Sequence, residues 1–425
     1  MNFSALRVAP HFLKILSRRG ITKPTEIQRL VIPRLLAGEN LLFQAPTGTG
    51  KTFAYLLPLF QRLFADPAGI QGKVRLLICA PTLELCSQIK GEVDFLLSER
   101  PADGVDAAAT ALAATASAAV ATGTAPRAAL LIGSADIKRQ IEMLKKEKPA
   151  VVVGNSARLL QLARMGRLRL DGVRAVVLDE GDRLAANELR EETEALLRFV
   201  PTGDRQTTAC SATLSAKSRE RLSSLFGPSI AVGSAITSDS AITSGSVPAV
   251  AFIQAEEKIT SIEHWAFFAE NRKKISCLRS LLAAAKPKKA LVFTARGADA
   301  GNILSQLQYH HFAAGGIWGD MEKRVRKAAM DGFRQGNLSV LVASDLACRG
   351  LDIAGISHVI ALDVPDDPEL YLHRSGRTGR TGKRGIMASI GNEEELRRLQ
   401  KIEKKLGITV YPKELYGGRV LAPEA

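Results

Sequence analysis

Residues 45–52 of this 425-residue chain have the types and spacing that phosphate binding requires. They read APTGTGKT and follow an apolar stretch, residues 41–44. A glycine-rich turn between a strand and a helix points backbone N–H groups at an anion, and the helix N-terminus adds the positive end of its dipole. Lys51 can reach the outer phosphates of a nucleotide, and the Thr52 hydroxyl suits Mg²⁺. The strict pattern begins with glycine, where this chain has Ala45, so an ordinary glycine turn is the alternative.

A pair of acidic residues follows a second apolar run, residues 175–178. A buried strand that ends in carboxylates can hold a magnesium ion beside a nucleotide. In this interpretation Asp179 holds the metal, directly or through water, and Glu180 orients and deprotonates the attacking water. The alternative is a charged helix start, because acidic residues favour the first turn of a helix.

Three arginines recur at every third position of residues 373–380, which read HRSGRTGR. Two of them follow a glycine, which predicts a loop. An arginine on a loop can reach a neighbouring site and stabilise charge on a transferring phosphoryl group, which is worth about 10³–10⁵ in rate. The alternative is a solvated basic face, the commoner fate of charge runs.

These segments, in this order, resemble the DEAD-box family of ATP-dependent RNA helicases from Phe3 to about Ile390. The further segments that carry the resemblance are GITKPTEIQ at 20–28, PTLEL at 81–85, SAT at 211–213 and VLVASDLACRGLD at 340–352. The resemblance implies an α/β fold of two tandem RecA-like domains, each a mainly parallel sheet flanked by helices. It also implies RNA-stimulated ATP hydrolysis that is coupled to closure of the two lobes and to local unwinding of short RNA duplexes or remodelling of RNA–protein complexes.

The resemblance assigns roles to individual residues. The expected ATP-binding residues are Phe3, Gln28, Thr47, Gly48, Thr49, Gly50, Lys51, Thr52 and Asp345. The expected catalytic residues are Lys51, Asp179, Glu180, Arg377 and Arg380, with Mg²⁺ at Thr52 and Asp179, in part through water. Coupling is expected at Asp182, Ser211, Thr213 and His373, and RNA binding at Pro81, Thr82, Gly133, Arg158, Thr294, Arg326 and Ser344.

Several of these assignments have alternatives that the sequence leaves open. Phe3 can stack on adenine or belong to the core. Gln28 can bind the adenine edge or cap a helix. Asp345 can hold the ribose or an arginine, and Ser211 and Thr213 can reach Asp182 or cap a turn.

The chain departs from the family pattern mostly in its RNA-facing segments. Leu83 replaces an arginine, Gly133-Ser134 replaces paired glycines, Asn155-Ser156-Ala157-Arg158 replaces Thr-Pro-Gly-Arg, Lys323 replaces a glutamine, Ser344 replaces a threonine, and Gly181 replaces an alanine of the acidic segment. We therefore expect intact ATP chemistry and an altered grip on RNA in the first lobe.

Apolar runs alternate with helical periods in both halves of the chain, which is typical of parallel sheets covered by helices on both faces. This pattern predicts, for example, strands at 41–44 and 314–317 and a helix at 393–406. The predicted ATP-binding lobe covers residues 1–232, with an alanine-rich insert at 101–127. Residues 233–260, of which 233–246 are rich in Ser, Ala and Thr, are expected to form a flexible linker, and residues 261–425 the C-terminal lobe.

Composition agrees with a polyanionic partner. The net charge is +15 with a pI near 9.7, which favours nucleic acid. The five cysteines show no metal-ligand spacing, and no apolar run approaches the roughly 18 residues of a spanning helix. We expect RNA, single-stranded or duplex, to be bound through its backbone, no membrane association, a monomer, and a reducing cytoplasmic location.

Three other functions remain as alternatives. One is a DNA-directed helicase or translocase, against which the family segments argue. Another is an RNA-binding clamp or assembly factor whose hydrolysis only times release. The third, an inactive scaffold, is disfavoured because the candidate catalytic residues are all present.

Overall fold

The computed structural model describes residues 2–423 except 47, 66–71, 99–125, 204, 213, 227–231, 237–249, 255–261, 295–296, 320, 346–352, 354 and 380–383. The chain divides into two compact units, Met1–Glu256 and Glu257–Ala425. Thr47, Thr213, Arg380 and the core of the alanine-rich insert lie outside the described residues, so the predictions for them are not addressed by the structure.

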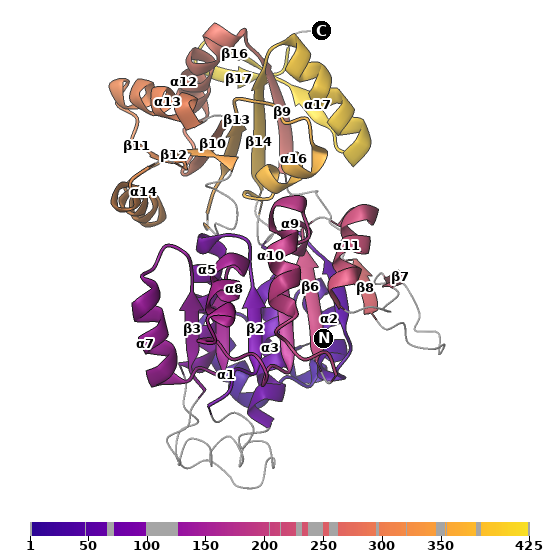
Figure 1. Ribbon diagram of the computed structural model, residues 1–425. Coiled ribbons are helices and arrows are strands. Elements are labelled where there is room, and N and C mark those ends of the chain that lie inside the picture. The colour runs from indigo at the N-terminus through magenta and orange to yellow at the C-terminus, as the bar shows by residue number, and fades with distance from the viewer. Residues whose placement is uncertain are drawn as a thin grey trace. The chain divides into compact units, whose positions relative to one another are not determined.

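The first unit is built on a parallel sheet whose described strands run in the order β3-β4-β2-β5-β6-β1-β8-β7 (Figure 1). Its strands are β1 (Leu41–Gln44), β2 (Leu76–Cys79), β3 (Ala128–Leu131), β4 (Val151–Gly154), β5 (Ala175–Asp179), β6 (Gln206–Ser211), β7 (Val232–Ile236) and β8 (Val250–Gln254). Its helices are η1 (Ser4–Leu6), α1 (Pro10–Arg18), α2 (Glu26–Leu36), α3 (Lys51–Ala65), α5 (Leu83–Leu97), α7 (Ile137–Glu147), α8 (Ser156–Arg164), α9 (Gly181–Leu184), α10 (Asn187–Leu197) and α11 (Ala216–Phe226).

Helices cover both faces of this sheet because its strands are apolar on both sides. Along β1, Leu41 and Phe43 pack in a core with α1, α2, α3 and α5, whereas Leu42 packs in a second core with α8, α10 and α11. Such runs, apolar at every position, are typical of buried parallel strands. The carboxyl ends of these strands therefore meet at one edge, where open α/β sheets bind ligands.

The second unit repeats this architecture, with the strand order β11-β12-β10-β13-β14-β9-β15 in its main sheet and a separate β16-β17 hairpin. Its strands are β9 (Ile262–Phe268), β10 (Ala290–Thr294), β11 (Ala314–Ile317), β12 (Val340–Ser344), β13 (His358–Ala361), β14 (Gly385–Gly391), β15 (Val410–Pro412), β16 (Glu414–Tyr416) and β17 (Arg419–Leu421). Its helices are η3 (Asn271–Lys273), α12 (Lys274–Ala285), α13 (Gly297–Tyr309), α14 (Lys323–Gln335), α16 (Pro368–Ser375) and α17 (Glu393–Leu406). The expected pair of parallel α/β domains is confirmed.

The prediction that residues 233–260 form only a linker is wrong. Strand β7 covers Val232–Ile236, and β8 covers Val250–Gln254. Strand β8 pairs in parallel with β1, so that Phe252 is a partner of Leu42, and both side chains are buried. The first unit therefore extends to Glu256, because a short apolar run inside a low-complexity segment completes its sheet.

Candidate nucleotide site and nucleic-acid-facing residues

The loop between β1 and α3 has the backbone of a phosphate loop. Gly48 and Gly50 have φ angles of 82° and 87°, in the left-handed region that glycine adopts without strain. A Cβ on Gly50 would lie 2.4 Å from Nε2 of Gln28, so a larger residue would adopt a strained φ angle and displace the Gln28 side chain. The Thr49 hydroxyl donates to the Pro46 carbonyl at 2.7 Å and thereby fixes the turn.

Lys51 begins α3 and lies over this loop. Its Nζ donates to the carbonyl oxygens of Ala45 and Pro46, at 2.6 and 2.9 Å. The ammonium group is thus held above the turn whose N–H groups would face a phosphate. Thr52, the next residue of the helix, is half-buried in the same first turn.

Gln28 connects the upstream segment with the phosphate loop. Its Oε1 accepts from the Thr25 backbone N–H at 3.0 Å in a capping box, and its Nε2 donates to the Gly50 carbonyl at 3.1 Å. These contacts match the helix-capping alternative and leave an adenine contact as a proposal. Phe3 is buried in the core of the first unit, which supports the core alternative for that residue.

The carboxylate of Asp179 is held by three donors at the end of β5. Its Oδ1 accepts from the Glu180 backbone N–H at 2.9 Å and from the Cys210 thiol at 3.2 Å. Its Oδ2 accepts from the Tyr55 hydroxyl at 2.8 Å. Burial and the neighbouring Asp179 charge raise the pKa values of Tyr55 and Cys210, so both remain protonated donors. The sequence reasoning missed Tyr55 and Cys210.

Glu180 follows Asp179 in the left-handed region, with φ 49° and ψ 51°. Its Oε2 lies 3.6 Å from Nη1 of Arg183. A left-handed backbone at a residue other than glycine is uncommon and is often found at functional sites. Next to it, Gly181 provides space, since a Cβ there would lie 3.1 Å from Leu222 of α11. Glycine in place of alanine at 181 therefore lets Leu222 of α11 pack closely against this turn.

The residues at this edge fit a magnesium ion. A threonine hydroxyl and a carboxylate are hard oxygen ligands, and magnesium is commonly held by one or two carboxylates together with substrate phosphates and water. Within the described ranges, no group of three or more His, Cys, Asp or Glu side chains could hold a metal ion. A site that relies on Thr52, Asp179 and the nucleotide itself agrees with that finding.

Two residues with predicted coupling roles lie beside this site. Ser211 is buried at the end of β6, and its carbonyl accepts from the Ala45 N–H at 3.0 Å. Asp182 is half-buried in α9. The backbone therefore ties the Ser211 segment directly to the phosphate loop, while a role in coupling remains a proposal.

The predicted RNA-binding residues of the first unit lie at strand ends of the same sheet. Pro81 follows β2, and Thr82 caps α5, its Oγ1 accepting from the Leu85 N–H at 3.2 Å. Arg158 is only 9% exposed. Its guanidinium donates to the carbonyls of Gly133 and Ala135, both at 3.0 Å, and to Oε1 of Gln140 at 2.9 Å. Arg158 thus holds the Gly133 turn in place.

In the second unit, Asp345 and Arg374 form a two-bond ion pair. Arg374 Nε donates to Oδ1 at 2.7 Å and Nη2 donates to Oδ2 at 2.6 Å. Asp345 therefore holds an arginine, and a contact with the ribose of ATP remains a proposal. Arg377 is buried at the end of the same segment, and His373 is half-buried on α16.

Of the remaining predicted RNA-binding residues of the second unit, two lie at strand ends and one lies on a helix. Thr294 and Ser344 end β10 and β12, are Cα partners in the sheet and are buried. Arg326 is half-buried on α14. A cavity of about 850 Å³ is lined by Thr294, Asp345 and Arg374 among others, so it opens beside Thr294 and the Asp345–Arg374 ion pair.

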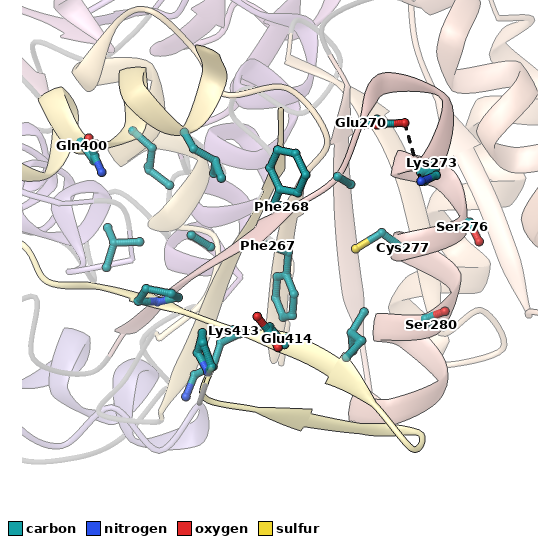
Figure 2. A pocket seen from close by; sticks show the side chains of 18 of the residues that line it. Phe267, Phe268, Glu270, Lys273, Ser276, Cys277, Ser280, Gln400, Lys413 and Glu414 are labelled. Atoms are coloured by element: carbon teal, nitrogen blue, oxygen red, sulfur yellow. Dashed lines mark ion pairs between the residues drawn. The ribbon is translucent and has the colours of Figure 1, made fainter. Parts of the chain in front are cut away.

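A separate cavity of about 740 Å³ lies between α12, α17, β9 and the C-terminal strands (Figure 2). Phe267, Phe268, Cys277, Lys413 and Glu414 are among its lining residues. None of the site residues predicted from the sequence and described in the structure lines it. We assign this cavity no role in the ATP chemistry.

Over the described residues, no helix is both long and apolar enough to cross a membrane. Of the described cysteines, Cys79, Cys86 and Cys210 are buried and free, and Cys277 is half-buried.

The fold and the site define a two-lobed helicase of the DEAD/DEAH type. The family model of the DEAD/DEAH box helicase matches residues 25–222, and the family model of the helicase conserved C-terminal domain matches residues 273–382. The chain is 33% identical over 409 residues to DEAD-box ATP-dependent RNA helicase CshC of Bacillus cereus, covering 96% of this chain and 92% of that one. It is 32% identical over 405 residues to CshA of Geobacillus kaustophilus, covering 95% and 76%. In fold it resembles S. cerevisiae Dbp5 bound to RNA and ADP BeF3, with a TM-score of 0.76, 24% identity and coverage of 96% and 95%. The chain belongs to the DEAD-box ATP-dependent RNA helicase family.

Proposed function

We propose that this chain is an RNA-stimulated ATPase whose two lobes close on ATP and RNA and thereby separate short RNA duplexes locally. The observation that carries this proposal is the arrangement in the first unit. The phosphate loop, Lys51 and the hydrogen-bonded carboxylate of Asp179 meet at the carboxyl edge of one sheet, while the arginines of residues 373–380 belong to the other unit.

In this mechanism, the backbone N–H groups of residues 48–52 and the Lys51 ammonium bind the phosphates of ATP. Glu180 orients the attacking water and accepts its proton. When bound at Thr52 and Asp179, Mg²⁺ neutralises charge on the outer phosphates. Arg377 and Arg380 stabilise the charge that develops on the transferring phosphoryl group. Neither unit holds all of these residues, so hydrolysis requires closure.

RNA stimulates turnover because it favours the closed form. Contacts from Thr82 in the first unit and from Thr294, Arg326 and Ser344 in the second would bind the sugar-phosphate backbone, which carries no sequence information. RNA and ATP that both prefer the closed form raise each other's affinity reciprocally. Asp182, Ser211, Thr213 and His373 would transmit the state of the γ-phosphate. The monomer and the cytoplasmic location belong to the same proposal.

A second candidate function is an RNA clamp whose hydrolysis only times release. Two observations favour it. Leu83 is the first residue of α5, where the family pattern has an arginine. The Arg158 guanidinium donates to the Gly133 carbonyl and holds that turn. A weakened grip in one lobe would retain ATP chemistry and reduce strand separation.

Steady-state ATP turnover, measured with single-stranded RNA and with DNA of the same sequence at several salt concentrations, tests the proposal. We expect RNA to raise turnover, DNA to have little effect, and stimulation to fall with salt. Lys51→Ala is the control that should lose ATP binding, whereas Arg380→Ala should keep it and lose about 10³-fold in turnover. Equal stimulation by DNA would favour the DNA-directed alternative. A duplex-separation assay then distinguishes the helicase from the clamp.

A further inference from the structure

The Tyr55 hydroxyl contacts Asp179, one of the two residues that would hold the magnesium ion. Tyr55 follows Thr52 by three residues on α3, so the two side chains share a helix face. The hydroxyl is fully buried and donates to Oδ2 of Asp179 at 2.8 Å.

The hydrogen bond from Tyr55 holds Oδ2 of the Asp179 carboxylate in one orientation. The Glu180 N–H and the Cys210 thiol hold the other oxygen, Oδ1.

The contacts of Asp179 also leave one defined position open. A carboxylate has about four lone-pair sites. The Glu180 N–H and the Cys210 thiol occupy both sites of Oδ1, and Tyr55 occupies one site of Oδ2. The second site of Oδ2 is the one that remains for a metal ion or for a water bound to it.

We propose that Tyr55 is a positioning residue for the magnesium site: its hydroxyl orients the Asp179 carboxylate, with Cys210 supporting the other carboxylate oxygen. The proposal rests on the proposed ATP-binding function. Outer partners that orient metal ligands typically contribute about 10–100-fold to metal affinity. The competing interpretation is that Tyr55 is a core side chain whose hydroxyl is merely satisfied by a nearby acceptor.

The test is a Mg²⁺ titration of the full chain at fixed ADP, read as the shift in melting temperature, with ADP in EDTA as the metal-free reference. Tyr55→Phe removes the hydroxyl and keeps the ring. We expect the Mg²⁺ concentration at half-maximal stabilisation to rise about 10-fold or more, with the effect of metal-free ADP unchanged. Tyr371→Phe is the matched control, because it removes an equally buried hydroxyl from the second unit, and its midpoint should equal that of the wild type.

An unchanged midpoint for Tyr55→Phe, or an equal shift for Tyr371→Phe, would overturn the proposal, since either result indicates a merely structural hydroxyl. Cys210→Ala gives a second measurement if Tyr55→Phe is not obtained folded. Its midpoint should shift in the same direction by less, because a thiol is the weaker donor, and an unchanged midpoint would count against the proposal. If ADP and Mg²⁺ do not stabilise the wild-type protein, the ATP-binding function is overturned as well. This measurement therefore distinguishes a failure of the ATP-binding function from a failure of the Tyr55 proposal alone.

Discussion

Arg374 and Asp345 are joined by two parallel hydrogen bonds, Nε–Oδ1 at 2.7 Å and Nη2–Oδ2 at 2.6 Å. The Arg374 side chain is 2% exposed, and its guanidinium lies 5.4 Å from the centroid of the Phe293 ring. A buried pair of this kind stabilises little relative to apolar residues, yet losing one partner leaves an uncompensated charge in the interior. The pair thus fixes α16, which carries Arg374, against the end of β12.

Asp345→Ala should destabilise the second unit by about 3–5 kcal/mol, because it leaves the Arg374 charge buried without its partner. Urea unfolding followed by tryptophan fluorescence measures this unit selectively, since both tryptophans, Trp265 and Trp318, belong to it. The control is the double variant Asp345→Ala/Arg374→Met, which removes both charges and should be more stable than the single variant. A double variant that is less stable than the single one would contradict this account.

Glu180→Gln should keep ATP binding and lose turnover by about two orders of magnitude or more, because an amide can orient a water but cannot accept its proton. The left-handed backbone at 180 is unchanged by this substitution, so the loss should appear in kcat and not in nucleotide affinity. Single-turnover hydrolysis and fluorescent-nucleotide binding measure the two effects. The control is Glu188→Gln, an exposed acidic residue of α10, which should behave as wild type. Turnover retained by Glu180→Gln would remove Glu180 from its proposed role.

Much of the fold could be predicted because buried parallel strands are apolar at every position and end at polar residues. Strands 41–44 and 314–317 and helix 393–406 have the predicted bounds. Strand β9 was missed, since the sequence IEHWAFF carries a glutamate and a histidine inside an apolar run. Strand β8 was missed because its neighbours are a Ser/Ala/Thr-rich segment.

The site was predictable only where chemistry follows from local spacing. Lys51, Thr52 and Asp179 follow from their segments. Tyr55 gave no such signal, because a tyrosine on an apolar helix face is usually a core residue, and its acceptor is 124 positions away along the chain. For Arg158 the sequence indicated a role that its contacts in the structure do not match. Its type suggested a phosphate contact, and only the fold reveals that its N–H groups are directed to the turn at Gly133.

Leu83→Arg should strengthen RNA binding, because residue 83 is half-exposed at the first position of α5 beside Thr82. An added phosphate contact raises affinity and steepens the salt dependence of log K by about 0.7 for single-stranded RNA. Fluorescence anisotropy with single-stranded RNA at several salt concentrations measures both. Leu83→Gln is the matched control, polar but uncharged, and should leave the slope unchanged. Identical slopes for Leu83→Arg and wild type would refute the idea that this position weakens the grip on RNA.

Acidification should destabilise the second unit through His264. Burial lowers the pKa of His264 to about 4 from an ordinary 6.5, and its Nδ1 lies 2.9 Å from the Tyr371 hydroxyl. Because the pKa of His264 is lower in the folded than in the unfolded protein, the neutral ring makes its full contribution to the free energy of unfolding above about pH 6.5. This contribution is lost as the pH falls toward 4. At pH 5 the loss is about 2 kcal/mol.

Tryptophan-detected urea unfolding between pH 7.5 and 5 measures this loss, and His264→Phe, which keeps a ring, should flatten the profile by that amount. Burial also lowers the pKa of His358 in the same unit, so part of the pH dependence should remain in this variant. A His264→Phe profile that runs parallel to the wild-type profile would contradict the assignment.

Arg158 should affect RNA binding through the turn it holds and not through a phosphate. Its guanidinium donates to Gly133, Ala135 and Gln140, and the residue is 9% exposed, so three of its five N–H groups already bind within the first unit. A residue that contacts a phosphate contributes about 0.7 to the slope of log K against log salt for single-stranded RNA, whereas a residue that positions a loop changes affinity without changing the slope. Arg158→Met should therefore weaken RNA binding and lower the melting temperature, with an unchanged slope. Arg326→Met, at the predicted phosphate contact of the second unit, should reduce the slope instead. A reduced slope for Arg158→Met would mean that the guanidinium leaves the turn and binds RNA directly.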